Sequence, residues 1–319
     1  MRRTTAIVAP LVLGLFLASI PQWAPRFWIY VMTQALVFAI FAMSLDLLLG
    51  YGGMPSFGHA AYYGIGAYAT AMVAPKLTGA LLPVLLVAAL AAGAFATPIG
   101  ALALRTRGIY FLMLTLAFAQ MLWGLSVNWI AVTKGTDGII NIPRPTLPGL
   151  DALGISFWQR GPFFYLVLAV AVVTYLLLLA VVSSPFGRTL EGIRENEERM
   201  RALGCPTYRY RLAAFVISCA LAGVAGAMAA FNNGFANPGL LYWTGSGLVL
   251  IACIVGGIRS LVGPALGAIA VLIVELALSA IPFVPVEAAD HWQLVLGALF
   301  IAIVLFLPGG IAGLVRRYT

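Results

Sequence analysis

Charged side chains are scarce in this sequence. They make up 9% of its 319 residues, whereas 62% of the residues are hydrophobic and the mean hydropathy is +1.03. A soluble globular domain carries about 25% charged residues, so the composition excludes that class and indicates an integral membrane protein. The apolar runs are long and continuous instead of short and alternating, which favours transmembrane helices over the strands of a membrane barrel.

Cysteine and histidine are also rare, with three and two residues. Cys205, Cys219 and Cys253 lie in or beside apolar runs without Cys-x-x-Cys spacing, so we interpret them as small apolar side chains and expect no metal site. The pattern Gly-x-x-x-x-Gly-Lys-Ser/Thr, which cradles nucleotide phosphates, is missing. We therefore expect this chain to hydrolyse no ATP, to hold no cofactor and not to be an enzyme.

The apolar runs predict an all-α, polytopic transmembrane bundle of about ten spans, some of them broken or re-entrant, in a single domain over residues 1–319. A span needs about 20 apolar residues, and fewer where it is broken. The candidate spans are residues 6–20, 27–49, 60–74, 81–104, 108–131, 162–183, 211–232, 242–258, 264–283 and 292–308. The first run follows two arginines as a signal peptide would, but the charge count below favours a retained span.

Basic residues sort the predicted loops into two sides. With the N-terminus inside and ten alternating spans, thirteen basic residues fall inside and five outside. The inside set is Arg2, Arg3, Arg105, Arg107, Arg188, Arg194, Arg199, Arg201, Arg209, Arg211, Arg259, Arg316 and Arg317, and the outside set is Arg26, Lys76, Lys134, Arg144 and Arg160. Because basic residues concentrate in cytoplasmic loops, both termini are predicted to be cytoplasmic. The net charge of +8 is thus assigned to orientation in the lipid membrane, and no nucleic acid is expected as a partner.

Residues 45–70 interrupt the apolar pattern with glycines, a proline and polar side chains. A break in a spanning helix frees backbone groups that lipid cannot satisfy, so it is tolerated where it is buried in protein or lines a cavity. We therefore predict a translocation pathway or gate. Its candidate residues are Asp46, Gly50, Gly52, Gly53, Ser56, His59, Gly64 and Gly66. Asp46 also fits a packing role at a helix end, and His59 is expected to hydrogen-bond freed backbone and not to bind a metal.

Two longer loops stand out. Residues 132–161 form a predicted outside loop with Thr136, Asp137 and Gly138, which either covers span ends or docks an extracytoplasmic partner. Residues 184–210 form a cytoplasmic segment that holds four of the ten acidic residues. Its apolar residues keep a helical period, and Gly204 marks a stop, so we predict one amphipathic helix over about 188–204. Its balanced charge favours a protein partner that takes the apolar face in a groove over a membrane surface.

Four blocks follow one another from about residue 45 to the C-terminus. They are Leu47-Leu48-Leu49-Gly50-Tyr51-Gly52-Gly53 with Ser56, Gly58-His59-Ala60-Ala61 and Gly64-Ile65-Gly66-Ala67-Tyr68; Gly135-Thr136-Asp137-Gly138 with Ile142-Pro143; Ser184-Pro185-Phe186-Gly187-Arg188 with Ile193-Arg194-Glu195-Asn196-Glu197 and Ala202-Leu203-Gly204; and Val255-Gly256-Gly257 with Ser260-Leu261, Gly263-Pro264 and Leu266-Gly267. Together they resemble the permease subunits of branched-chain amino acid ABC transporters. The long outside loop favours the LivM-like over the LivH-like subunit.

The resemblance implies a multi-pass protein of the bacterial inner membrane. It implies a second, homologous LivH-like permease, two cytoplasmic ATPase subunits that bind the ATP, and a periplasmic substrate-binding protein. The cytoplasmic segment would then be a coupling helix with contacts to the ATPase. Its candidate coupling residues are Arg188, Leu190, Glu191, Ile193, Arg194, Glu197, Glu198, Arg199, Ala202 and Gly204. Leucine, isoleucine and valine are the expected substrates, with urea, amides or other amino acids as alternatives.

An ion-coupled secondary transporter is the more remote alternative. Proton relays need ionisable side chains within the spans, and Asp46, His59 and Glu275 are the candidates. This interpretation leaves the projecting mixed-charge segment without a role. A membrane scaffold or sensor would explain neither that segment nor the broken helices.

Overall fold

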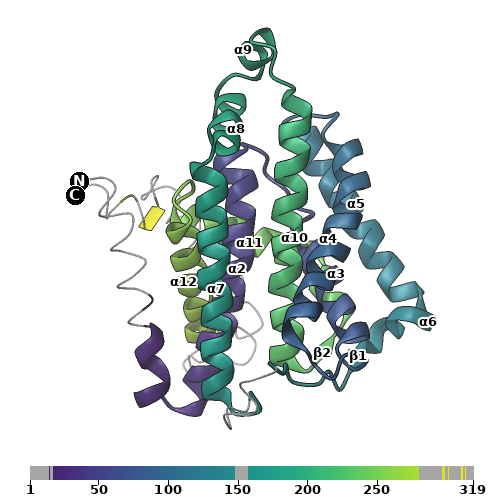
Figure 1. Ribbon diagram of the computed structural model, residues 1–319, viewed down its shortest axis with the longest axis vertical. Coiled ribbons are helices and arrows are strands. Elements are labelled where there is room, and N and C mark those ends of the chain that lie inside the picture. The colour runs from purple at the N-terminus through teal and green to yellow at the C-terminus, as the bar shows by residue number, and fades with distance from the viewer. Residues whose placement is uncertain are drawn as a thin grey trace.

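The computed structural model describes residues 17–147 and 157–279, together with 14, 297–298, 301, 310–311 and 313. Within this part of the chain the fold is a bundle of helices with one two-stranded antiparallel sheet (Figure 1). Five described helices are long and apolar enough to cross a membrane. The predicted helical membrane protein is therefore confirmed at that level.

The elements follow in chain order. They are α2 (Arg26–Asp46), the π-helical turn η1 (Leu47–Tyr51), α3 (His59–Val73), α4 (Leu81–Ala103), α5 (Ile109–Asn128), α6 (Ile130–Thr133), the 3₁₀ turn η2 (Gly135–Asp137), β1 (Ile139–Ile140), α7 (Arg160–Ser183), α8 (Pro185–Glu195), α9 (Glu197–Ala202), α10 (Thr207–Asn233), β2 (Phe235–Ala236), the 3₁₀ turn η4 (Pro238–Leu241), α11 (Trp243–Gly256) and α12 (Val262–Ser279). The long apolar helices are α2 continued by η1, α4, α5, α7 and α10. Shorter apolar helices are α3, α11 and α12.

The predicted spans from residue 27 to 258 each coincide with a helix to within a few residues. The span predicted over 264–283 begins within α12 and runs past the described residues. Most of the first predicted span, the last span at 292–308, both termini and residues 148–156 of the outside loop lie outside the described residues. The number of crossings stays a prediction.

Helix α10 is at the centre of the bundle and packs against α2, α3 and α4. Small residues allow these close approaches, as is typical of membrane helices. A side chain on Gly66 would collide with the backbone of Gly223, and one on Gly226 would collide with the carbonyl of Tyr63. Helices α5 and α7 are more peripheral and expose large apolar side chains such as Tyr110 and Leu176.

The two ends of the bundle carry the two predicted sets of basic residues. Helices α8 and α9 lie at the top of Figure 1, whereas α6 and the β1–β2 sheet lie at the bottom. At the top, Arg107 forms an ion pair with Glu197. At the bottom, Arg160 donates to the main-chain oxygen of Arg26 at 3.1 Å. These contacts agree with the sorting by sequence, while the end that faces the cytoplasm stays a prediction.

Candidate functional site

The predicted break follows directly from α2. The helix widens into the π-helical turn η1, whose C-terminal Gly52 N–H donates to Leu47 O at 3.0 Å, and Met54 N–H donates to Leu48 O at 2.9 Å. Residues 52–58 then run without helix until α3 begins at His59. Single π turns within helices frequently mark functional sites, and the interruption predicted here is confirmed.

Asp46 joins this break to a second interruption of the chain. Its buried carboxylate accepts the main-chain N–H of Arg259 at 2.9 Å and of Leu261 at 3.2 Å. Both donors have a positive φ, 67° and 54°, and lie in the turn between α11 and α12. Hydrogen bonds from N–H groups to an ionised acceptor are among the stronger ones in proteins. These bonds show Asp46 as a packing partner at a helix end, and its part in a gate stays a prediction.

Three glycines of the break lie where a side chain does not fit. A Cβ at Gly50 would overlap the Asp46 carboxylate and come 2.8 Å from Arg259 N, and one at Gly52 would come 2.8 Å from Leu48 O. Gly53 has a φ of +64° and faces the Arg194 side chain, whose Cγ would lie 2.8 Å from an added Cβ. Since only glycine adopts such a φ without a steric penalty, Gly53 is required by conformation as well as by space.

His59 is fully buried at the start of α3. Its ring stacks on Phe41 with centroids 5.2 Å apart, and its Nε2 lies 2.9 Å from Ser44 Oγ. Because the Ser44 hydroxyl donates its one proton to Phe41 O at 2.7 Å, Nε2 carries the proton and donates to Ser44 Oγ. His59 Nδ1 is a buried atom that has no hydrogen-bond partner among the described residues. The predicted bond from His59 to freed backbone is wrong, since its partner is a side chain on α2.

The remaining candidates of the gate set have structural neighbours. Ser56 is buried, and its hydroxyl accepts the Gly58 N–H at 3.2 Å, which closes the turn that leads into α3. Gly64 lies against Leu241 of η4, and Gly66 lies against Gly223 of α10. These two glycines serve helix packing one and two turns beyond the break, and the structure does not bring them to it.

Helix α8 begins where Ser184 caps it, with the hydroxyl accepting the Gly187 N–H at 3.4 Å. Its apolar face is buried within this chain, since Leu190 is fully buried and Ile193 is 4% exposed. The prediction that these two side chains fill a groove on a partner is therefore wrong. The amphipathic period was correct, but the chain's own helices cover that face.

The polar face of α8 contacts both interruptions. A guanidinium N–H of Arg194 donates to the carbonyl oxygen of Gly50 in η1. Glu191 pairs with Arg259, in the turn after α11, at 3.1 Å. Partial burial and the nearby charge of Arg259 both lower the pKa of Arg194. The carbonyl freed by the π turn is thus satisfied by a side chain of the predicted coupling segment.

Asn196 divides this segment into two helices, so the single helix predicted over 188–204 is wrong. Its backbone is extended, with φ −157°, and its side-chain oxygen accepts the Arg199 N–H at 2.8 Å, which caps α9. The α9 turn ends at Ala202, and Gly204 follows with a φ of +81°. The predicted stop at Gly204 is confirmed.

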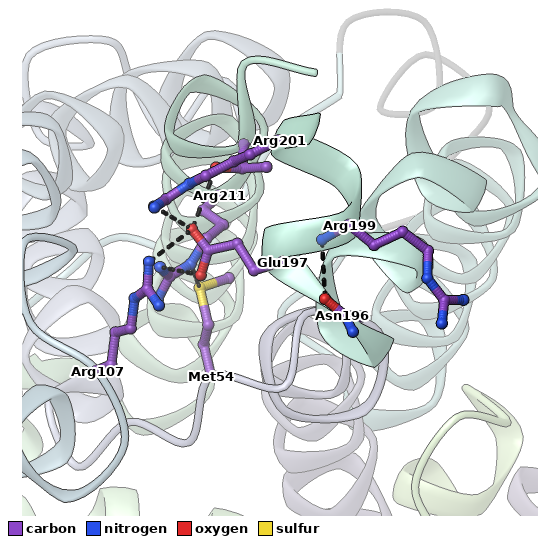
Figure 2. A network of polar contacts seen from close by, with 8 residues as sticks. Met54, Arg107, Asn196, Glu197, Arg199, Arg201 and Arg211 are labelled. Atoms are coloured by element: carbon purple, nitrogen blue, oxygen red, sulfur yellow. Dashed lines mark hydrogen bonds and ion pairs between the residues drawn. The ribbon is translucent and has the colours of Figure 1, made fainter. Parts of the chain in front are cut away.

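Glu197 is the centre of a polar cluster formed with Arg107, Arg201 and Arg211, which we call the Glu197 cluster (Figure 2). Its carboxylate oxygens lie 3.4, 2.6 and 3.4 Å from those three guanidinium groups in turn. Arg211 also reaches Met54 in the break, with Nε 3.5 Å from the sulfur. The cluster therefore connects α9, the α4–α5 loop, the start of α10 and the break.

Sequence reasoning assigned Glu197 to the site but missed its partners. Arg107, Arg201, Arg211 and Arg259 entered only as counts of positive charge. Their position at span ends was the available signal, because a basic residue there either faces water or pairs with a carboxylate. Met54 had no signal of its own.

The other coupling candidates are exposed. Arg188, Glu198, Arg199, Ala202 and Gly204 are open to solvent, and so is Leu203 with 75% of its surface accessible. No ion pair of Arg188, Glu198 or Arg199 occurs among the described residues. This outer surface of α9 is available to a partner, unlike the buried face of α8.

The outside-loop candidates lie at the opposite end of the bundle. Thr136 and Asp137 are exposed in η2, and Gly138 leads into β1, which pairs with β2 after α10. Further along, the main-chain N–H of Thr146 donates to Gly79 O at 2.8 Å. The described part of the loop thus covers span ends, and the docking of an extracytoplasmic partner stays a prediction.

The chain matches a family model described as "Branched-chain amino acid transport system / permease component" over residues 27–304. The chain belongs to this family. A permease protein LivM of a high-affinity branched-chain amino acid transport system from Escherichia coli is 30% identical over 97% of this chain and 75% of the relative. BraD, a permease protein of a high-affinity branched-chain amino acid transport system from Pseudomonas aeruginosa, is 28% identical over 88% of this chain and 93% of its own length.

LivH of Salmonella typhimurium, also named as a permease of this transport system, is 28% identical over 88% of this chain. The branched-chain permease family thus includes relatives of both LivM and LivH type, and the resemblance inferred from the four blocks is confirmed. No solved structure matches this chain.

Proposed function

We propose that this permease is the LivM-like subunit of an ABC importer that moves leucine, isoleucine and valine across the bacterial inner membrane. Family membership supports the transport role, and the names of the relatives support the substrate class. A LivH-like permease is the proposed partner within the membrane. Two cytoplasmic ATPase subunits supply the energy, and a periplasmic binding protein delivers the substrate.

One observation carries the proposed mechanism. Helix α8 contacts both interrupted regions, through Arg194 to Gly50 and through Glu191 to Arg259. Asp46 links these regions to each other. A displacement of α8 and α9 by an ATPase subunit would therefore act on the η1 break and the α11–α12 turn together. We assign the break as the gate and α8–α9 as the coupling segment.

The ATPase contact is proposed to be the exposed surface of α9. Leu203 supplies the apolar anchor, and Glu198 and Arg199 flank it with charges of opposite sign. Exposed ion pairs contribute about 0–1 kcal/mol each, so the apolar side chain is expected to dominate affinity and the charges to set orientation.

The proposal is tested by reconstituting the full chain with the permease, ATPase and binding-protein partners encoded beside it. We expect leucine uptake into vesicles that stops with vanadate and continues with a proton ionophore. Uptake that survives vanadate and stops with the ionophore would identify an ion-coupled transporter instead. Failure of the chain to co-isolate with an ATPase subunit would also contradict the proposal.

The identity of the substrate is tested separately, on the binding protein. Calorimetry on the purified binding protein should show leucine, isoleucine or valine as the tightest ligands. Preferential binding of urea, a short amide or another amino acid would keep the importer and replace its cargo.

A further inference from the structure

A cavity of ≈ 430 Å³ lies at the end of the bundle opposite α8 and α9. It is formed between α2, α7, the end of α10, Phe235 of β2 and Arg144. Its size is within the range of about 300–1,000 Å³ typical of small-molecule sites. Its lining includes Tyr30, Gln34, Arg144, Arg160, Phe163 and Asn232. The positive-inside count puts this end outside, where substrate arrives.

Two arginines line this cavity, and no carboxylate of a described residue lines it with them. Arg144 lies over the ring of Phe163, with Cζ 4.8 Å from the centroid, and Arg160 lies over Tyr30 at 5.4 Å. None of the described lining residues is acidic, and neither arginine forms an ion pair with a described residue. Burial lowers the pKa of Arg144, and the charge of Arg160 lowers it further. The cavity therefore holds two like charges that an anion would compensate.

Hydrogen-bond acceptors lie beside these donors. Gln34 donates its amide N–H to the Tyr30 hydroxyl at 2.9 Å, and Tyr30 in turn donates to Asn233 Oδ1 at 3.5 Å. The amide of Asn232 donates to the same oxygen at 3.4 Å. In these bonds the side-chain amide nitrogens of Gln34 and Asn232 are the donors, which fixes the orientation of both amides. Their side-chain carbonyl oxygens accept no bond from a described residue. Two guanidinium groups with two free amide oxygens match the carboxylate and ammonium of an α-amino acid.

We propose that this cavity is an outer binding site for the zwitterionic head group of the transported amino acid, with Arg144 and Arg160 on the carboxylate. The exposed ring of Phe235, which also lines the cavity, offers apolar contact to an aliphatic side chain. The inference rests on the proposed function, because it takes an amino acid as the cargo. It assigns to the permease a recognition step after release from the binding protein.

The test measures binding to the purified full chain in phosphatidylcholine nanodiscs by saturation-transfer NMR. L-leucine should bind to the wild-type chain, and leucinamide, which lacks the carboxylate, should bind at least about tenfold more weakly. The double variant Arg144→Gln/Arg160→Gln should bind leucine at least about tenfold more weakly than the wild type. Lys76→Gln removes an exposed charge elsewhere at the same end and should change the affinity less than twofold.

Equal binding of leucine and leucinamide to the wild-type chain would overturn the proposal, and this comparison does not depend on the folding of any variant. Retained leucine affinity in a folded double variant would overturn it as well. So would loss of leucine binding when phosphatidylglycerol replaces part of the phosphatidylcholine, since the arginines would then hold a lipid phosphate. If vesicles take up leucine but the binding results contradict the site, the importer assignment stands and the site is rejected. If vesicles take up no leucine but the chain still binds a carboxylate, the cargo is another amino acid.

Discussion

The two ends of this bundle differ in how their arginines are paired. At the α8–α9 end, three arginines converge on Glu197, and Arg259 pairs with Glu191. At the other end, Arg144 and Arg160 lie on aromatic rings beside a cavity without a described carboxylate partner. A guanidinium taken partly out of water is costly unless it is compensated, so the first end is internally complete and the second has room for an anion.

In the proposed importer, this difference assigns the transmission of motion to the α8–α9 end and substrate recognition to the cavity end. The ion pairs of the Glu197 cluster hold α9, α10 and the break in fixed relative positions. A segment that transmits motion needs such a connection to the part that it moves. Arg144 and Arg160, which have no described carboxylate partner, lie beside the amide oxygens of Gln34 and Asn232. Such an arrangement suits a ligand that carries both a carboxylate and an ammonium group. The predictions below alter one end at a time, beginning with the largest expected effect.

The largest effect is expected from Asp46→Ala. The substitution leaves the part-buried N–H of Arg259 and the buried N–H of Leu261 without the carboxylate that accepts them. With about 1.5–3 kcal/mol for each hydrogen bond to a charged group, the free energy of unfolding should fall by about 3 kcal/mol or more. Denaturant titration in mixed micelles measures it, with exposed Asp137→Ala as the control. A loss of about 0.5 kcal/mol or less would show that Asp46 does not hold the two interruptions together.

Glu197→Gln gives the α8–α9 end the charge pattern of the opposite end. Three guanidinium groups would then share a site without the Glu197 carboxylate. Arg107 and Arg201 have half-exposed side chains, so the cost of about 1–3 kcal/mol is expected from Arg211, whose side chain is 10% exposed. We also expect the variant, unlike the wild type, to be stabilised by added sulfate in a thermal unfolding assay. Glu198→Gln removes an exposed neighbouring charge and should stay within about 0.5 kcal/mol of the wild type. Equal responses of the two variants would mean that the Glu197 cluster stabilises nothing.

The sequence predicted the helices well because their signal is local. A run of apolar residues predicts a membrane helix without any knowledge of tertiary contacts. The break at 50–58 is predicted in the same way, because glycine and proline interrupt such a run. The coupling segment shows the limit of this reasoning. The period of Leu190 and Ile193 indicated an apolar face, but whether this chain or a partner covers that face depends on tertiary contacts, and this chain covers it.

The polar contacts could not be predicted for the same reason. Glu197 is separated from Arg107 by ninety positions in the sequence, and Asp46 from Arg259 by more than two hundred. A single sequence gives the charges of these residues but not their pairing. At Asn196 a local signal was present, since asparagine favours the N-cap of a helix, and it was overlooked because the surrounding apolar period continued through it.

Gln34→Glu performs the reverse change at the cavity end. It places a carboxylate of nearly the same shape beside Arg144 and Arg160. Partial compensation should raise the free energy of unfolding by about 0.5–1 kcal/mol while it lowers leucine affinity at least about tenfold. Asn141→Asp adds the same charge in the exposed loop at this end and should do neither. A destabilised Gln34→Glu chain would mean that the arginines are already compensated.

The smallest effect on stability is expected at the exposed tip of the compensated end. Leu203 has 75% of its surface accessible, so Leu203→Ser removes almost no packing and should change the free energy of unfolding by no more than about 0.5 kcal/mol. In the reconstituted importer the same variant should lose most of the ATPase stimulation by loaded binding protein, since it removes the proposed apolar anchor. Leu203→Met keeps an apolar side chain of similar size and should retain it. Full ATPase stimulation in the Leu203→Ser variant would place the ATPase contact elsewhere. A lower free energy of unfolding with unchanged ATPase stimulation would mean that Leu203 packs within the chain and has no part in coupling.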